Sequence, residues 1–394
     1  MGCSMQTVTQ GTSNLDPHRD LLAYRNEFPI LGKKTFLNTC SLGALSRRSR
    51  ANVNEFLDLW DDLGASAWYE LWVGRLAELR QAYGRTINAA PERIALMPSI
   101  SVAVAGVSSG LDFSKRKKVV MSDLDFPTLG HGFLAKRQQG VHVEFVRSPN
   151  RVTVPLELFE AAIDEDTALV ATSHVYFTSG AIQDIKTLAR IAHERGAMLM
   201  VDAYQGTGHL PTDVNDLDVD FYMSGSLKWL LGGPGITFLY ASEPACLQEP
   251  TVAGWWGMGN MFDFDVTSLQ FRSEAARYEM GTPSMAAVYA ALGGCSIVNE
   301  IGSQRIRERD IALTEDLINR AIEAGLKPRV APTPEQRTPI VLLDFDEPKP
   351  IVAALARQGI VVDSRPGAVR ISPYFYNTIE ENEIVIQAIK AATR

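Results

Sequence analysis

Lys228 has the surroundings of a reactive amine. It is the only side chain that ionises near neutral pH in the stretch 221–242, FYMSGSLKWLLGGPGITFLYAS. Burial among apolar residues disfavours the charged ammonium, so we expect a lowered pKa, and a neutral amine forms a Schiff base with an aldehyde cofactor. The flanking glycines favour tight turns that bring backbone close to a ligand. Taken alone, a strand-end lysine that extends its charge to water is the commoner outcome.

Asp202 favours the chemical interpretation. It is the sole charged residue between Arg195 and Asp213 and ends the apolar segment MLMVDA. Pyridoxal 5'-phosphate (PLP) acts as an electron sink while its pyridine nitrogen stays protonated, and a carboxylate partner secures that proton. A helix N-cap would also explain an aspartate here. Asp202 and Lys228 on neighbouring strands of one sheet favour a PLP site.

The elements that must position these two residues form an alternating pattern. Apolar segments predict strands at 118–123, 140–146, 167–175, 198–203, 219–226 and 236–242, and Leu188, Ile191 and Ala192 predict a helix within 185–196. Strands joined by helical crossovers predict an α/β fold with a mostly parallel, helix-covered sheet. Ligands of such sheets bind beyond the carboxyl ends of the strands.

The chain is expected to divide into three parts. Residues 1–18 are polar and predict a flexible arm, and 19–294 would hold the N-terminal segment and the large PLP-binding domain. In 295–394 a charged helix is followed by short strands and two further helices, which predicts a small C-terminal α+β domain.

Composition excludes several classes of protein. The 394 residues are 46% hydrophobic with a net charge of -8, which disfavours nucleic acid and anionic membranes as partners. No apolar run approaches the ~20 residues that span a bilayer, and the N-terminus lacks a signal core, so we expect a cytoplasmic protein. The four cysteines form no CxxC pair and the histidines no ligand spacing, so we expect no metal site.

Several motifs resemble one family. VDAYQG and SGSLKWLLGGPG resemble the aspartate and Schiff-base lysine segments of the class V aminotransferase group of fold type I PLP enzymes. That group includes cysteine desulfurases, isopenicillin N epimerase-like enzymes and kynureninases. DFPT (125–128), AGWWGM (253–258) and YEMGTPSM (278–285) resemble the kynureninase branch, and the likeness extends from LNTCSLG to RISPYFYNT. It implies a seven-stranded-type, mostly parallel large domain with helices on both faces.

The resemblance implies roles residue by residue. Lys228 would form the internal aldimine and then move the Cα proton, while Asp202 would pair with the pyridinium nitrogen. The other implied cofactor contacts are Ser99, Ser101, Phe126, His174, Gln205 and Ser226, with Trp256 and Thr282 reaching the phosphate of a partner subunit. The implied substrate contacts are Cys40, Ser41 and Arg370, with Arg365 the rival for the carboxylate. A homodimer with shared active sites follows from the two partner contacts.

Some of these residues also have purely structural interpretations. The serines fit helix N-caps, and Phe126 fits the core. Trp256 fits an interface core. A hydrogen-bonded strand-end residue is the commoner outcome for His174.

The chain departs from the familiar members of the group. Between Gly359 and Arg370 it has no cysteine, so desulfuration through a persulfide on this segment is not expected. Leu227 replaces the tyrosine or histidine that precedes the lysine in relatives. Leu129 and Gln205 replace an aspartate and a histidine of kynureninases. Kynurenine hydrolysis is therefore disfavoured, and we expect a different amino-acid substrate.

What remains is chemistry at Cα or Cβ of an amino acid bound through an external aldimine and a quinonoid. The first expectation is lyase-type cleavage of a C–S or related bond at Cβ, and the alternative is a class V aminotransferase. Epimerisation and oxidative deamination are further alternatives. A non-catalytic regulator is not expected, because the 18-residue arm has no room for a DNA-binding segment.

Overall fold

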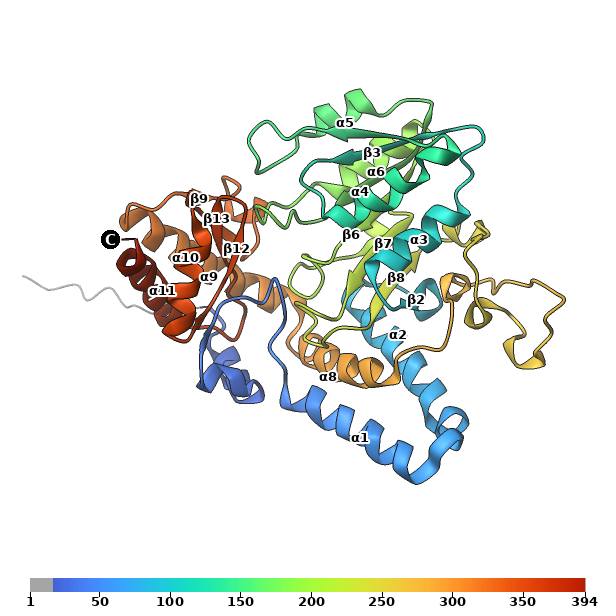
Figure 1. The fold of residues 1–394 in the computed structure, drawn as a ribbon, viewed down its shortest axis with the longest axis horizontal. Coiled ribbons are helices and arrows are strands. Elements are labelled where there is room, and N and C mark those ends of the chain that lie inside the picture. Colours follow the sequence, from blue (N-terminus) through green and yellow to red (C-terminus); the bar gives the residue numbers. More distant parts are fainter. Residues whose placement is uncertain (1–16, 394) are drawn as a thin grey trace, which may run out of the picture.

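A seven-stranded sheet forms the centre of the molecule in the computed structural model, which describes residues 17–393 (Figure 1). The strand order is β2-β8-β7-β6-β5-β3-β4. The strands are β2 (Ile94–Met97), β3 (Lys118–Ser122), β4 (His142–Val146), β5 (Thr167–Ser173), β6 (Met198–Asp202), β7 (Phe221–Gly225) and β8 (Thr237–Ala241). β8 alone runs opposite to the other six strands and is antiparallel to β2 and β7, so the expected mostly parallel α/β sheet is confirmed.

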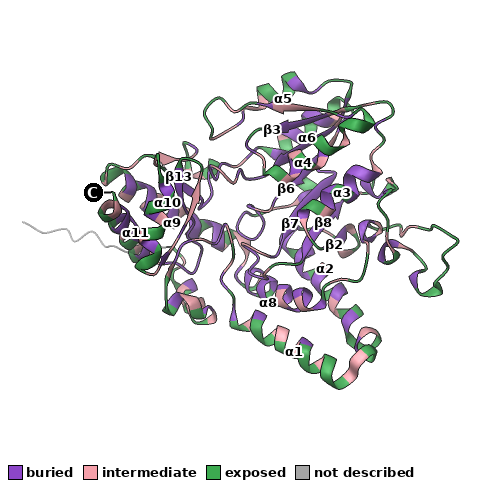
Figure 2. Cartoon of the chain, in the orientation of Figure 1, coloured by how far each residue is buried: buried purple, intermediate pink, exposed green. Residues whose placement is uncertain are grey.

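Alternate strand residues face two helical layers. Met121 packs in one apolar cluster with residues of α3 and α4, while Val120 packs in another with residues of α2, α6 and α8. Since successive strand side chains point to opposite faces, helices cover both sides, and both faces are buried (Figure 2). The helices of this part of the chain are α1 (Arg47–Leu63), which packs on α8, α2 (Val73–Ile87), α3 (Ile100–Gly110), α4 (Pro127–Leu134), α5 (Leu156–Ala162), α6 (Ile185–Glu194), α7 (Val214–Leu217) and α8 (Met285–Ile301).

A second, antiparallel sheet lies beside the first. Its order is β12 (Asp363–Arg365), β13 (Ala368–Ile371), β10 (Val341–Asp344) and β9 (Pro328–Arg329). It packs with α9 (Ser303–Glu323), α10 (Pro348–Arg357) and α11 (Ile379–Ala392) around a separate apolar cluster. The last helix begins where Thr378 and Glu381 form a capping box, as its sequence favours.

The N-terminal segment joins the two parts. Strand β1 (Thr35–Phe36) pairs in parallel with β11 (Ile360–Val361), and Asn38 forms a bridge with Ser372. Helix α8 runs across positions 294 and 295, so the domain boundary expected there stays a prediction. Most of the expected arm 1–18 lies outside the described residues.

Short turns of 3₁₀ or π helix fill the connections. They are η2 (Arg19–Glu27), η3 (Pro29–Gly32), η4 (Gly64–Ser66), η5 (Trp68–Trp72), η6 (Pro91–Arg93), η7 (Ala135–Gln139), η8 (Ala245–Leu247), η9 (Trp255–Gly257), η10 (Met261–Asp263), η11 (Ala275–Tyr278) and η12 (Pro334–Gln336).

Across residues 17–393, no single helix has the length and apolarity to cross a membrane. The pair α8 and α9 together meets those two criteria, with a bend of 82° between them.

Candidate active site

A cavity of about 470 Å³ opens at the edge of the central sheet where strands β5, β6 and β7 end. The predicted residues that line it are Cys40, Ser41, Ser99, Ser101, Phe126, Asp202, Gln205, Lys228 and Arg365. They come from the N-terminal segment, the central sheet and the second sheet. The fold thus brings together at one cavity residues that lie up to some three hundred positions apart in the chain.

Lys228 lies in the connection between β7 and β8. Its Nζ is 4.6 Å from the centre of the Tyr204 ring and 5.9 Å from that of Phe126. Burial lowers the pKa of Lys228 to about 8, although the nearby Cys40 and Asp202 favour the charged form. A substantial fraction of this amine is therefore neutral near physiological pH, as Schiff-base formation requires.

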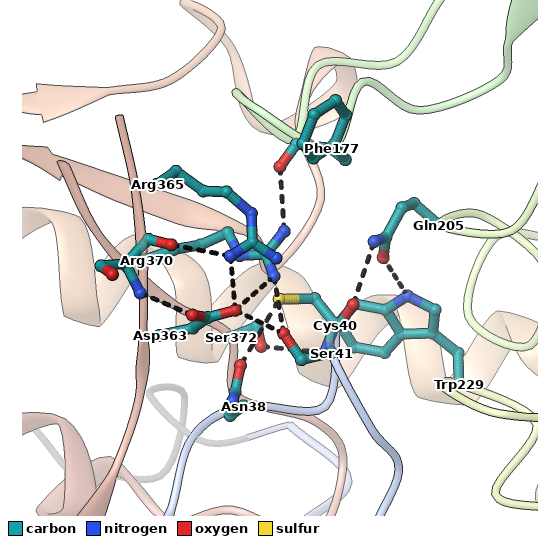
Figure 3. Close-up of polar contacts among 11 residues, drawn as sticks. Asn38, Cys40, Ser41, Phe177, Gln205, Trp229, Asp363, Arg365, Arg370 and Ser372 are labelled. Atoms are coloured by element: carbon teal, nitrogen blue, oxygen red, sulfur yellow. Dashed lines mark hydrogen bonds and ion pairs between the residues drawn. The ribbon is translucent and has the colours of Figure 1, made fainter. Parts of the chain in front are cut away.

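The backbone around Lys228 is held from both sides. The amide of Gly43 donates to Leu227 O at 2.9 Å, and a Cβ at Gly43 would lie 2.2 Å from Lys228 O, so this close approach requires glycine. The buried indole of Trp229 donates from Nε1 to Gln205 Oε1 at 2.9 Å. The predicted cofactor contact Gln205 thus also orients the residue after the lysine (Figure 3).

Asp202 ends β6 and is buried. Its Oδ1 accepts a hydrogen bond from the Tyr204 amide at 2.9 Å. Burial raises the pKa of this carboxyl, and the Tyr204 amide and Lys228 offset that effect only in part. Within residues 17–393 no arginine or lysine forms an ion pair with Asp202, so a protonated pyridine nitrogen is the kind of cation that would stabilise its charge.

Two helix N-termini meet at another part of the cavity. Ser99 caps α3, where its Oγ accepts from Val102 N at 3.3 Å. Ser101 Oγ hydrogen-bonds to Thr128 Oγ1 at 2.9 Å, and Thr128 lies in the first turn of α4. Hydroxyl groups and free amides at helix N-termini suit a phosphate group.

Arg370 lies behind the cavity wall and is 1% exposed. Its Nη2 donates to Ser41 Oγ at 2.6 Å and to Asp363 Oδ2 at 3.0 Å, and its Nη1 to Phe177 O at 3.2 Å (Figure 3). Arg365 does line the cavity, and its Nη1 donates to the same Asp363 oxygen at 2.6 Å. Of the two candidate carboxylate ligands, Arg365 is the one at the cavity surface.

Besides Arg370, four predicted residues lie outside the cavity lining. His174 Nδ1 hydrogen-bonds to Tyr222 OH at 2.8 Å, and burial lowers the pKa of His174 to about 4, so the ring is neutral. Ser226 donates to Gly233 O at 2.7 Å. Trp256 is buried against Trp68, whereas Thr282 is exposed. Their contacts with a cofactor stay predictions.

Three residues in or beside the cavity were not predicted from the sequence. Tyr204 lies two positions after Asp202 and faces Lys228. Thr128 lies in the DFPT motif itself, and Asp363 lies in the DSR segment. For the first two, position within a motif was an available signal. The position of Asp363 depends on contacts with residues far away in the chain.

The cavity therefore combines the parts that PLP needs. A buried amine of lowered pKa, a buried carboxyl without a cation, an aromatic ring near the amine and two helix N-termini all border one space. On a mostly parallel sheet with helices on both faces, this set defines a PLP-dependent enzyme of fold type I.

The chain belongs to the class V aminotransferase family, whose model matches residues 74–385. The resemblance inferred from the sequence motifs is thereby confirmed, and so are the cofactor PLP and the assignment as an enzyme of the lyase or aminotransferase type. A small-molecule amino-acid substrate agrees with this family.

Proteins with different named activities match this chain over nearly its whole length. It is 33% identical to the uncharacterized aminotransferase YcbU of Bacillus subtilis (strain 168), over 94% of this chain and 97% of that protein. It is 28% identical to the kynureninase of Bacillus cereus (strain ATCC 10987 / NRS 248), over 95% and 92% of the two chains. Among solved structures, the cystine C-S lyase C-DES matches with a TM-score of 0.86 and 20% identity, over 92% and 99% of the chains.

Proposed function

We propose that this enzyme cleaves a bond at Cβ of an amino-acid substrate, with a sulfur or related leaving group. PLP, once bound, would withdraw electrons from Cα of the substrate. The observation that carries the proposal is Lys228: among the described lining residues it is the one amine whose charge changes near neutral pH. Lys228 would remove the Cα proton, and loss of the Cβ substituent would follow.

The other residues of the cavity would bind and orient. Asp202 would hold the proton on the pyridine nitrogen. Ser99 and Ser101, at the start of α3, would bind phosphate, and Phe126 would cover one ring face. Arg365 and Arg370 would attract the substrate carboxylate from the second sheet. The products would be a 2-keto acid and ammonia, after water adds, and the released thiol.

One comparison and one feature of the sequence support this reaction, and another comparison supports the alternative. C-DES is named a cystine C-S lyase, and the strands β11, β12 and β13 of this chain carry no cysteine, in line with a lyase that uses no persulfide there. The alternative is an aminotransferase, which the name of the YcbU relative favours. In that reaction Lys228 would return the proton to the cofactor and no Cβ bond would break.

A homodimer is the second part of the proposal. Exposed apolar side chains are concentrated in two segments, 57–73 and 252–269. The segments contact each other where the rings of Tyr69 and Phe262 lie 6.3 Å apart. The exposed side chains are Leu57, Trp60, Tyr69, Leu71, Val73, Val252, Trp255, Phe262, Phe264, Val266 and Leu269. A surface of this kind suits a permanent subunit interface. Thr282 is exposed and lies a short way after the segment 252–269 in the chain. It would then reach the active site of the partner subunit.

The experiment compares products. Holoenzyme is incubated with cystine, S-substituted cysteines and other amino acids, with and without pyruvate, and thiol, ammonia and keto acids are measured. Thiol (or, from cystine, cysteine persulfide) and ammonia released in equal amounts without pyruvate support the lyase, whereas turnover that requires pyruvate and forms alanine contradicts it. Lys228→Ala should lose the visible absorbance of the bound cofactor and the activity, while Lys186→Ala, at an exposed ion pair with Asp216, should keep both.

A further inference from the structure

Asp363 places a carboxylate of this chain at the site where the two arginines would bind a substrate carboxylate. One oxygen, Oδ2, accepts hydrogen bonds from Ser41 Oγ at 2.7 Å, from Arg365 Nη1 at 2.6 Å and from Arg370 Nη2 at 3.0 Å. The other oxygen, Oδ1, accepts from the Ser364 amide at 2.7 Å. Figure 3 shows the three side chains converging on this carboxylate.

Both N–H groups of Arg370 Nη2 are already used in this arrangement. Its Nη1 and Nη2 both donate to groups of the chain, and its Nε is buried without a hydrogen-bond partner among the described residues. A substrate carboxylate that takes the bidentate geometry of arginine would need a donor that Asp363 now occupies.

The charges lead to the same conclusion. Burial raises the pKa of Asp363, but the hydrogen bond from Ser41 and the two guanidinium groups outweigh burial and hold that pKa below its usual value. Asp363 is therefore ionised at neutral pH. Two arginines and one aspartate leave a single net positive charge at this wall, which matches one substrate carboxylate.

We propose that Asp363 is a specificity-determining residue that competes with the substrate carboxylate for the Arg365–Arg370 pair. Its side chain is 28% exposed, whereas that of Arg370 is 1% exposed, so the carboxylate can turn away while the guanidinium stays in place. A ligand that binds only through its carboxylate must displace Asp363, and the binding free energy that it gains is largely offset by the lost contacts of Asp363. An amino acid is also held through its amine, and that second contact supplies the free energy needed to displace Asp363. The inference rests on the proposed function only in taking the ligand to be a carboxylate.

The test measures binding of a simple carboxylate to holoenzyme. Propionate and its neutral analogue propionamide are titrated by calorimetry into the wild type and into Asp363→Asn. The Kd of propionate should fall by about tenfold in the variant, because a competing charge has gone, while that of propionamide stays unchanged. Asp363→Glu, which keeps the charge, should stay close to the wild type.

A control and a second variant complete the design. Asp344→Asn removes an aspartate that pairs with Arg329 at 2.6 Å in the same sheet, away from the cavity, and should leave propionate binding unchanged. Asp363→Ser gives a second measurement if the asparagine variant fails to fold. A propionate Kd that is unchanged or higher in Asp363→Asn and Asp363→Ser would overturn the proposal. Because propionate carries no leaving group, this result does not depend on whether the enzyme cleaves at Cβ.

Discussion

The Nζ of Lys228 lies 4.6 Å from the centre of the Tyr204 ring. The backbone amide of Tyr204 also donates to Asp202, so one residue contacts both groups that would act on the cofactor. An ammonium group is attracted to the face of an aromatic ring, and this attraction favours the observed position of the Lys228 amine over the Tyr204 ring. The ring itself rests on Gly225, where an added Cβ would lie 2.3 Å from three of its atoms.

Gly225→Ala should therefore displace Tyr204. We expect the free energy of unfolding to fall by about 1–3 kcal/mol, as for other overpacked sites, and cofactor binding to weaken with it. Denaturant unfolding and PLP titration would measure the two effects. Gly32→Ala, where nothing lies within 4 Å of the new Cβ, is the matched control and should change neither. An unaltered PLP affinity in Gly225→Ala would show that the Tyr204 position does not matter to the cofactor.

Capture of the cofactor should depend on pH through Lys228. Because burial lowers the pKa of Lys228 to about 8, the neutral amine becomes the major form only above that pH. The rate of PLP incorporation by the apoprotein should thus rise with pH from pH 6 upward and level off above about 8 to 9. Stopped-flow absorbance would record it. A rate still rising towards pH 10.5 would indicate an unperturbed lysine.

Asp202→Asn should separate cofactor binding from catalysis. The amide keeps the shape of the side chain but loses the negative charge that would hold the pyridine nitrogen protonated. We expect the visible band of bound cofactor to remain and kcat to fall by about 100-fold or more, which corresponds to roughly 3 kcal/mol. Absorbance spectra and steady-state rates test this. A kcat within about threefold of the wild type would be incompatible with the assigned role.

The exposed apolar segment 252–269 should control the state of association. Val266 is 95% exposed and Phe264 is 68% exposed, so a charge at either position costs little in the separate chain but much in an interface. Phe264→Asp with Val266→Asp should shift a dimer towards monomer in sedimentation velocity and reduce activity if sites are shared. Ile322→Asp, at an exposed position on α9, is the control. A wild type that sediments as a monomer would refute the dimer.

The fold and the centre of the site were predictable because their signals are local. Apart from the edge strand β4, the strands from 118 to 242 are largely buried on both faces and appear as short apolar runs. Lys228 and Asp202 stand out as lone charges in or beside such runs. Strand β2 was missed because four apolar residues before a helix carry no distinctive pattern. The antiparallel direction of β8 was missed because strand direction depends on pairing rather than composition.

The cavity wall around Arg370 could not be derived from the sequence. A motif placed Arg370 near the substrate, but the tertiary structure decides that Arg370 is buried, that Asp363 pairs with it, and that Arg365 faces the cavity. Ser41 and Arg370 meet only because the N-terminal segment lies beside the second sheet. The sequence by itself determined which groups can react, since burial of a lone charge follows from its neighbours in the chain. The tertiary structure decided which charges are already paired, because pairing energy depends on distances between residues that are remote in sequence.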